Sequence, residues 1–203
     1  MVDEHERQLL RRATELGVSD ARLIDAARIR VEDDLSAICK DPGCPGYGQG
    51  ANCPPHVMKP EAFRELLRAY PRALVFKFDV PTEVLLGDGR FEVSRIVHET
   101  AAALERHAQT CGYAAARGFA AGSCKRIFCS EEIDCRVLSG NGDCRHPEAA
   151  RPSSSGLGVN FFELSRTVDW PIHKITSESN PEEVPMGLMA GIVLLAPAAP
   201  GTP

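Results

Sequence analysis

The sequence lacks any long hydrophobic run and any excess of positive charge. Its longest apolar stretch, Leu188 to Ala196, is far shorter than the roughly 20 residues that a membrane-spanning helix needs. The formal net charge is −5, whereas nucleic-acid-binding surfaces usually carry a basic excess. The acidic start, Met1 to Glu6, is followed by no apolar segment of the kind found in signal peptides. These absences predict a cytoplasmic protein that binds neither nucleic acid nor membrane.

Common catalytic signatures are also missing. The chain contains no Gly-x-Gly-x-x-Gly dinucleotide fingerprint, no phosphate-binding loop and no nucleophile-elbow serine. It also lacks the C-x3-C-x2-C loop of radical S-adenosylmethionine enzymes, and no segment repeats at a fixed period. The function must therefore be sought in other residues.

The bulk composition is that of an ordinary globular protein. Hydrophobic residues make up 43% and charged residues 25% of the 203 positions, enough to build a real core. We expect a single α+β metal-binding domain over residues 1–195, followed by a disordered tail, rich in proline and alanine, over residues 196–203.

Helical and strand patterns are mixed along the chain. Helices are predicted over residues 4–16, 61–69, 91–110 and 153–168, and strands over residues 21–27, 73–80, 113–121 and 186–195. This order predicts an α+β fold in which helices pack on a mixed or antiparallel sheet, with two cysteine-rich metal-binding loops. Both loops border predicted strands, so we expect the two sites on the same side of the sheet.

Seven of the eight cysteines fall into two tight groups. In a reducing cytosol, clustered thiols are more typical of metal or catalytic sites than of disulfides, which are the alternative for an oxidising compartment. The groups span 15 and 21 residues. The predicted ligands are Cys39, Cys44 and Cys53 in the first group, and Cys124, Cys129, Cys135 and Cys144 in the second.

The first group has three thiols in a loop rich in glycine and proline, over residues 39–60. Such loops wrap iron–sulfur clusters, and their backbone N–H groups can point at the sulfurs. Three thiolates are one ligand short of a full set. The fourth could come from Cys111, from His56 or from the second loop, or one iron could stay open for chemistry. The alternative is a zinc site in which His56 is the fourth ligand.

The second group supplies four thiols within one loop, a complete ligand set. The loop contains no C-x-x-C pair, which a zinc ribbon would show, so the pattern favours a [4Fe–4S] cluster. Basic residues lie between and after these cysteines, and nearby cations ease the burial of an anionic cluster, although each could equally be a solvated surface residue. They are Lys125, Arg126, Arg136, Arg145 and Arg151. Cys111 lies apart from both groups and is expected to be a small buried hydrophobe.

Several motifs resemble one known family. They are Cys44-Pro-Gly-Tyr-Gly, Cys53-Pro-Pro, Ala121-Gly-Ser-Cys, Cys144-Arg-His-Pro and Arg151-Pro-Ser. From about Ala21 to Leu195 the chain resembles the predicted metal-binding proteins named domain of unknown function 2284, which are suspected of binding iron–sulfur clusters. The resemblance implies ligand roles for the seven grouped cysteines. The chain departs from the family in a longer second loop, and in Ser153-Ser-Ser and Gly158-Val-Asn where Ser-Met-Glu and Gly-Ile-Asp are usual.

The leading functional hypothesis is a redox protein with two [4Fe–4S] clusters. The four-cysteine cluster would relay electrons, and the three-cysteine cluster would meet a small-molecule substrate or a redox partner protein. The alternatives are a structural zinc-binding interaction module, and a non-redox enzyme that uses an open iron as a Lewis acid or sulfur acceptor. The sequence does not indicate an oligomeric state or name the substrate.

Overall fold

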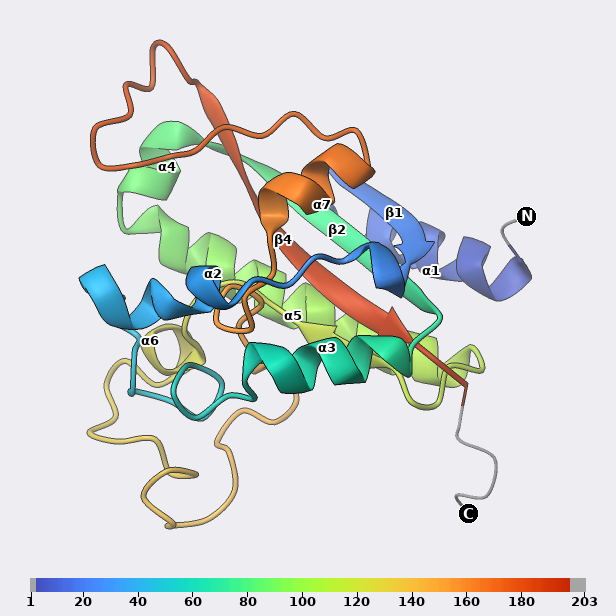
Figure 1. Ribbon diagram of the computed structural model, residues 1–203, viewed down its shortest axis with the longest axis horizontal. Coiled ribbons are helices and arrows are strands. Elements are labelled where there is room, and N and C mark those ends of the chain that lie inside the picture. The colour runs from blue at the N-terminus through green and yellow to red at the C-terminus, as the bar shows by residue number, and fades with distance from the viewer. Residues whose placement is uncertain (1–2, 198–203) are drawn as a thin grey trace.

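The computed structural model describes residues 3–197 and has the α+β fold that the sequence predicts (Figure 1). Its centre is a four-stranded antiparallel sheet in the order β1-β2-β4-β3. The strands are β1 (Asp20–Asp25), β2 (Arg72–Pro81), β3 (Arg117–Phe119) and β4 (Met186–Leu195). The two long strands pair along their whole length, with Arg72 opposite Leu195 and Pro81 opposite Met186.

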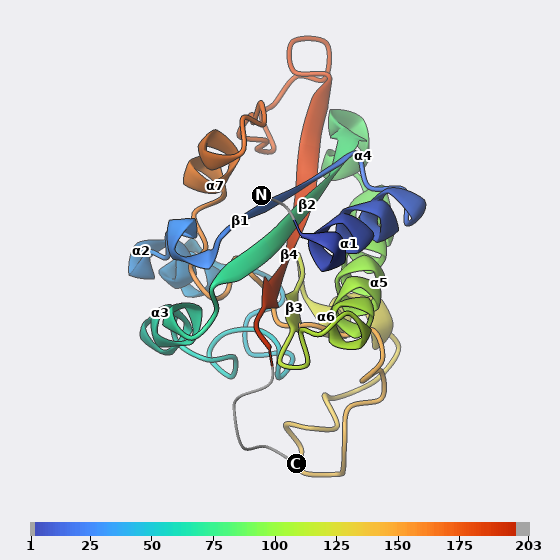
Figure 2. The ribbon, with the colours of Figure 1, turned by 90° about the vertical axis from the view of Figure 1, so that its right-hand side faces the viewer.

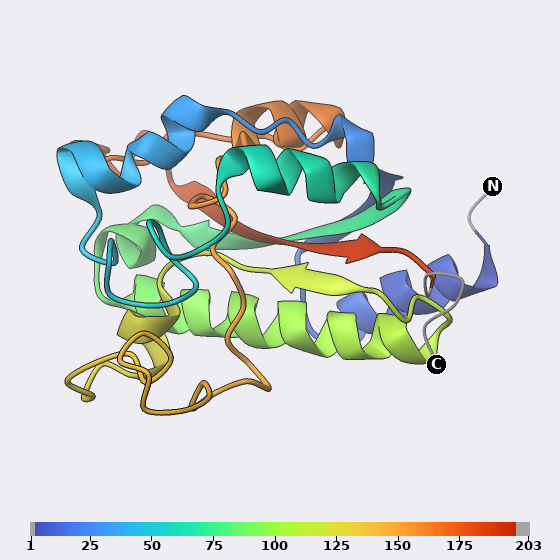
Figure 3. The ribbon, with the colours of Figure 1, turned by 60° about the horizontal axis from the view of Figure 1, so that its bottom comes forward.

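Helices cover both faces of the sheet, so the molecule has three layers (Figure 3). One face carries α1 (Glu4–Glu15) and the long α5 (Gly89–Thr110). The other carries η1 (Ala26–Arg28), α3 (Pro60–Arg68) and α7 (Phe161–Thr167). The short elements are α2 (Asp33–Ala37), η2 (Cys39–Gly43), α4 (Thr82–Leu86) and α6 (Cys124–Phe128). No helix among residues 3–197 is both long and apolar enough to span a bilayer.

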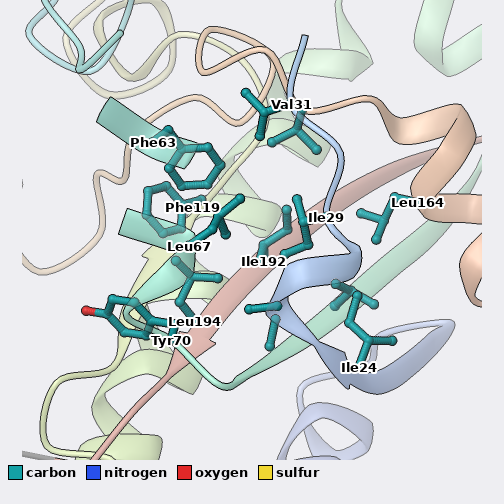
Figure 4. Packing of buried hydrophobic residues seen from close by; sticks show 14 of the residues in the cluster. Ile24, Ile29, Val31, Phe63, Leu67, Tyr70, Phe119, Leu164, Ile192 and Leu194 are labelled. Carbon is teal, nitrogen blue, oxygen red and sulfur yellow. The ribbon is translucent and has the colours of Figure 1, made fainter. Parts of the chain in front are cut away.

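The sheet divides the core into two clusters because successive side chains of a strand point to opposite faces. In β4, Ile192 and Leu194 pack under α3 and α7, while Val193 and Leu195 pack under α1 and α5. Both strands in the middle of the sheet are buried on both faces, which is why each reads as a continuous apolar run rather than an alternating one. Figure 4 shows the first cluster, where Phe63 of α3 meets Phe119 of β3 with ring centroids 5.1 Å apart.

Three predicted elements differ from the structure. The strand expected over residues 113–121 is reduced to three residues, and the strand expected over 21–27 ends at Asp25, where η1 begins. The helix expected over 153–168 is wrong in its first half. Gly158 there has φ +81°, and a Cβ on it would lie 2.3 Å from the carbonyl oxygen of Glu32, so the segment turns instead. The helix begins only after Asn160, whose side chain caps it.

The two cysteine loops lie at one end of the sheet, as expected (Figures 1 and 2). The first loop runs from η2 to α3. The second leaves β3, forms α6 and returns to the sheet through a bridge between Ala120 and Ser153. The amide of Ser153 also donates to the carbonyl of Asn52 (3.0 Å), which ties the base of the second loop to the first. Of the predicted disordered tail, residues 198–203 lie outside the described part of the chain, and Ala196 is buried in the core.

Candidate metal centre

The four cysteines of the second loop line a single small cavity. Cys124, Cys129, Cys135 and Cys144 face it together with the ring of Phe128. The first two come from the two ends of α6, which α5 holds in place through a hydrogen bond from Arg95 Nη2 to the carbonyl of Ile127 (2.7 Å). The structure therefore gathers a complete set of four thiols that are 20 residues apart at most in sequence.

Backbone N–H groups point at the sulfurs of this cavity. The amide of His146 donates to Cys144 Sγ (3.4 Å). Burial acts to raise the pKa of Cys135, but hydrogen bonds from the amides of Leu138, Ala51 and Val137 outweigh it and lower the pKa. Hydrogen bonds to the charged form of a group favour that form, so these amides prepare a thiolate at this position.

A buried lysine belongs to the wall of the same cavity. Lys125 is 9% exposed, and its Nζ donates to the carbonyls of Cys129 (2.7 Å) and Glu132 (2.6 Å). Within residues 3–197 no carboxylate forms an ion pair with it. Because an isolated buried charge is costly, an anionic group beside it would be stabilised. Four thiolates around a metal supply that negative charge.

The three cysteines of the first loop form a second, more open group. Cys53 is 5% exposed, Cys39 is half-buried and Cys44 is exposed. Cys39 and Cys44 are joined by the turn of η2, in which the amide of Cys44 donates to the carbonyl of Cys39 (2.9 Å). The amide of Gly46 donates to Cys44 Sγ (3.4 Å). Burial raises the pKa of both Cys39 and Cys53, and the charge of Cys44 raises each further.

Ser123, from the second loop, reaches into the first group. The side chain is 8% exposed, and its Oγ has no partner within hydrogen-bond geometry among the described residues. It faces Gly46, where a Cβ would lie 2.9 Å from Ser123 Oγ and 3.7 Å from Cys44 Sγ. Burial raises the pKa of Cys53, and the Ser123 hydroxyl opposes that rise. A buried hydroxyl with no partner is therefore aimed at the three-cysteine group.

The contact is reciprocal, because residues of the first loop reach the sulfur of Cys124 in the second loop. Asn52 Nδ2 donates to Cys124 Sγ (3.5 Å), and a Cβ on Gly50 would lie 3.7 Å from the same sulfur. Burial raises the pKa of Cys124 to about 11, and the nearby charges of Cys53 and Cys144 contribute to that rise. The two groups are thus neighbours, joined by the contact of Asn52, the residue before Cys53, with Cys124.

The thiols must lose protons to bind metal. Burial also raises the pKa of Cys129, against the opposing charge of Arg145. With Cys39, Cys53 and Cys124 shifted the same way, most of the set holds its protons at neutral pH in the metal-free protein. Metal ligation by these residues therefore releases protons, and the gain in binding free energy must include that cost.

Cys111 and His56 were the other candidates for a fourth ligand of the three-cysteine site. Cys111 is buried between α5 and α1, where its Sγ contacts Gln8 Oε1 (3.4 Å) and His107 Nε2 (3.6 Å). His56 is exposed at the end of the first loop. All eight cysteines are free thiols. Among residues 3–197, no three histidine, cysteine, aspartate or glutamate side chains form a ready-made site for a single metal ion.

Sequence reasoning missed the residues that surround the thiols. It treated Lys125 as one basic residue among five, and it gave no role to Asn52 or Ser123. It also missed an aromatic wall in which Phe128 stacks on His146 (centroids 5.4 Å apart) under the guanidinium of Arg95 (5.0 Å). A usable signal for Ser123 was its place directly before Cys124, at the start of a helix.

Fold and site together define an α+β protein with two adjoining groups of free thiols. The chain belongs to the family of predicted metal-binding proteins named domain of unknown function 2284, whose model matches residues 22–195. No curated protein matches the chain, and no solved structure does.

Proposed function

We propose that this protein is a redox protein that holds two [4Fe–4S] clusters side by side. Cys124, Cys129, Cys135 and Cys144 would hold one cluster, and Cys39, Cys44 and Cys53 the other. The observation that carries the proposal is the cavity lined by four thiols and by Lys125, which is buried and forms no ion pair with a carboxylate among residues 3–197. Thiolates are the usual ligands of iron–sulfur clusters, and an anionic cluster complements this buried cation.

The first group supports a different role from the second. Its three thiols include the exposed Cys44, and Cys111, which contacts Gln8 and His107, lies outside the group. Ser123 reaches this group from the second loop, and a neutral hydroxyl is a hydrogen-bond donor to a thiolate. We therefore assign Ser123 as a donor to Cys53 and leave the fourth coordination position of the three-cysteine site open to a substrate or partner.

The contact between the loops supports electron transfer between the two sites. A bound cluster accepts and releases one electron at a time, and the four-cysteine site adjoins the three-cysteine site through Cys124, Asn52 and Cys53. The protein's part is to hold the sulfurs with amide donors, to balance their charge with Lys125 and to keep the two sites in contact.

Metal analysis of anaerobically purified protein tests the proposal. Two [4Fe–4S] clusters require about eight iron and eight sulfide per chain, with a broad visible absorption. Cys135→Ser should remove about half of both and leave the other cluster in place. A colourless protein with one or two zinc ions and no sulfide would instead establish the zinc-binding module and exclude the redox role.

A further inference from the structure

A second hollow lies beside the metal centre. It has a volume of about 650 Å³ and is walled by α4, α7, the first half of β4 and residues 172–177. This size falls within the range of small-molecule pockets. We call it the α4–α7 cavity.

The lining of the α4–α7 cavity is mostly apolar. Six of the large apolar side chains that line it come from four separate parts of the chain. They are Leu85, Phe161, Phe162, Ile172, Ile175 and Leu188. Phe162, one of these side chains, is 43% exposed. An apolar molecule seated here would cover it.

The charged side chains that line the cavity are both positive. Arg90 and Lys174 line it, together with His173, and no aspartate or glutamate among residues 3–197 does. Among the described residues, none of the three belongs to an ion pair. Arg90 is held in place by bonds from Nη1 to the carbonyls of Leu86 (3.1 Å) and Gly87 (2.8 Å), so its guanidinium is fixed at the wall. A planar, fixed guanidinium suits a carboxylate.

Two short stretches of chain link the cavity to the three-cysteine site. Ala121 lines the cavity and stands two residues before Ser123, so the two are within about 7 Å along the chain. Ser155 also lines it, and the next residue, Gly156, packs on Pro54, which follows Cys53. A Cβ on Gly156 would lie 2.7 Å from Pro54 Cδ.

We infer that the α4–α7 cavity binds a small organic carboxylate with an apolar body, beside the three-cysteine site. The apolar lining would take the body, and Arg90 and Lys174 the carboxylate. This inference names a class of small molecule that the open iron site would meet, and in that respect it rests on the proposed function. The binding itself depends only on the cavity.

Calorimetric titration of the metal-loaded protein tests the inference. The probes are octanoate and 4-phenylbutanoate, each paired with the alcohol of the same carbon skeleton. We expect at least one carboxylate to bind and its alcohol to bind about tenfold more weakly or not at all, because the alcohol lacks the charge. Arg90→Gln and Lys174→Gln should each weaken the carboxylate about tenfold. Arg11→Gln, the same change of charge on α1, should leave binding unaltered.

The result that overturns the inference is binding of neither carboxylate, or equal binding of carboxylate and alcohol, or binding insensitive to both Arg90→Gln and Lys174→Gln. Iron and sulfide are measured on the same preparation, so the two proposals fail separately. Carboxylate binding to a protein without iron would sink the iron–sulfur proposal alone. Full iron and sulfide content without carboxylate binding would sink the cavity proposal alone.

Discussion

Lys125 brings a positive charge into the wall of the four-cysteine cavity, where it meets only backbone carbonyls in the described structure. A nearby cation stabilises the more negative, reduced state of a cluster and so raises its reduction potential. Lys125→Met should therefore make the potential of the four-cysteine cluster more negative. A redox titration monitored by electron paramagnetic resonance measures this reduction potential.

The matched control is Arg126→Met. Arg126 is the next residue, but it is exposed and its guanidinium lies over Phe91 (4.8 Å) rather than in the cavity. Its replacement should shift the potential much less. Equal shifts of the reduction potential in the two variants would show that only the overall charge matters and that the position of Lys125 in the cavity wall has no effect.

Ser123 should act on the other cluster. Its hydroxyl is buried without a partner and faces the three-cysteine group. Ser123→Ala removes the donor, so the potential of the three-cysteine cluster should fall, while Ser123→Thr, which keeps a hydroxyl, should restore most of it. If alanine and threonine give the same potential as serine, the hydroxyl does not contact the cluster ligands.

His98 predicts how stability depends on pH. It is fully buried, its Nδ1 accepts from the amide of Arg151 (3.0 Å), and burial, followed by the charge of Arg151, lowers its pKa to about 4. Below pH 6.5 this histidine becomes protonated in the unfolded chain, whereas in the folded protein it stays neutral until about pH 4. The contribution of His98 to the free energy of unfolding is therefore complete above pH 6.5 and is lost as the pH falls towards 4.

Between pH 7.5 and 5 this loss amounts to about 2 kcal/mol. Urea unfolding at the two pH values measures it, with His98→Asn as the reference, since asparagine can accept the same amide but does not titrate. The native protein should lose about 2 kcal/mol more than the variant. An identical pH dependence in both would contradict the assignment.

At this scale the sequence predicts the thiols well and their surroundings poorly. Cysteine spacing is local, so the two groups can be recognised without a structure. The contact of Asn52 with Cys124 spans 72 residues, and the approach of Ser123 to Gly46 spans a similar length of chain. Gly50 of the first loop likewise lies against Lys125, since a Cβ on Gly50 would be 3.2 Å from the Cβ of Lys125. No local sequence pattern predicts contacts between segments so far apart in the chain.

At the scale of elements, the two cysteine loops interlock at Gly46 and Ser123. A Cβ on Gly46 would lie 2.6 Å from Ser123 Cβ, too close for either loop to stay in place. Gly46→Ala should therefore push the loops apart and cost about 1–3 kcal/mol, with loss of the three-cysteine cluster first. Ser123→Gly removes the opposing atom, so the double variant should retain more cluster than Gly46→Ala alone.

Iron content and urea unfolding of the four proteins in this double-mutant cycle measure the coupling. Strictly additive effects would mean that the loops do not touch at this point.

The elements themselves show why pattern reasoning succeeds or fails. Residues 186–195 and 73–80 are runs of apolar residues, and both form central strands because both of their faces are buried. The helical pattern over residues 153–168 was misleading because its first half must thread between Pro54 and Glu32, where Gly156 and Gly158 permit a close backbone approach. That constraint comes from Pro54 of the first cysteine loop and from Glu32 before α2, and it leaves no periodic signal.

At the scale of the whole molecule, the fold brings three features together at one end of the sheet. The four-cysteine cavity contacts the three-cysteine group through Asn52 and Cys124, and short stretches of chain at Ala121 and Ser155 link the α4–α7 cavity to the same group. The sequence predicted that the two cysteine loops would share a side, because both border strands. Their direct contact, and the cavity beside them, follow only from the packing of distant segments.

The paramagnetic resonance spectrum of the fully reduced protein tests this arrangement most directly. Two reduced clusters in contacting loops should give a spectrum broadened and split by magnetic interaction, and Cys135→Ser should leave the simple signal of one isolated cluster. Two independent signals that simply add, or no iron-based signal at all, would contradict the account.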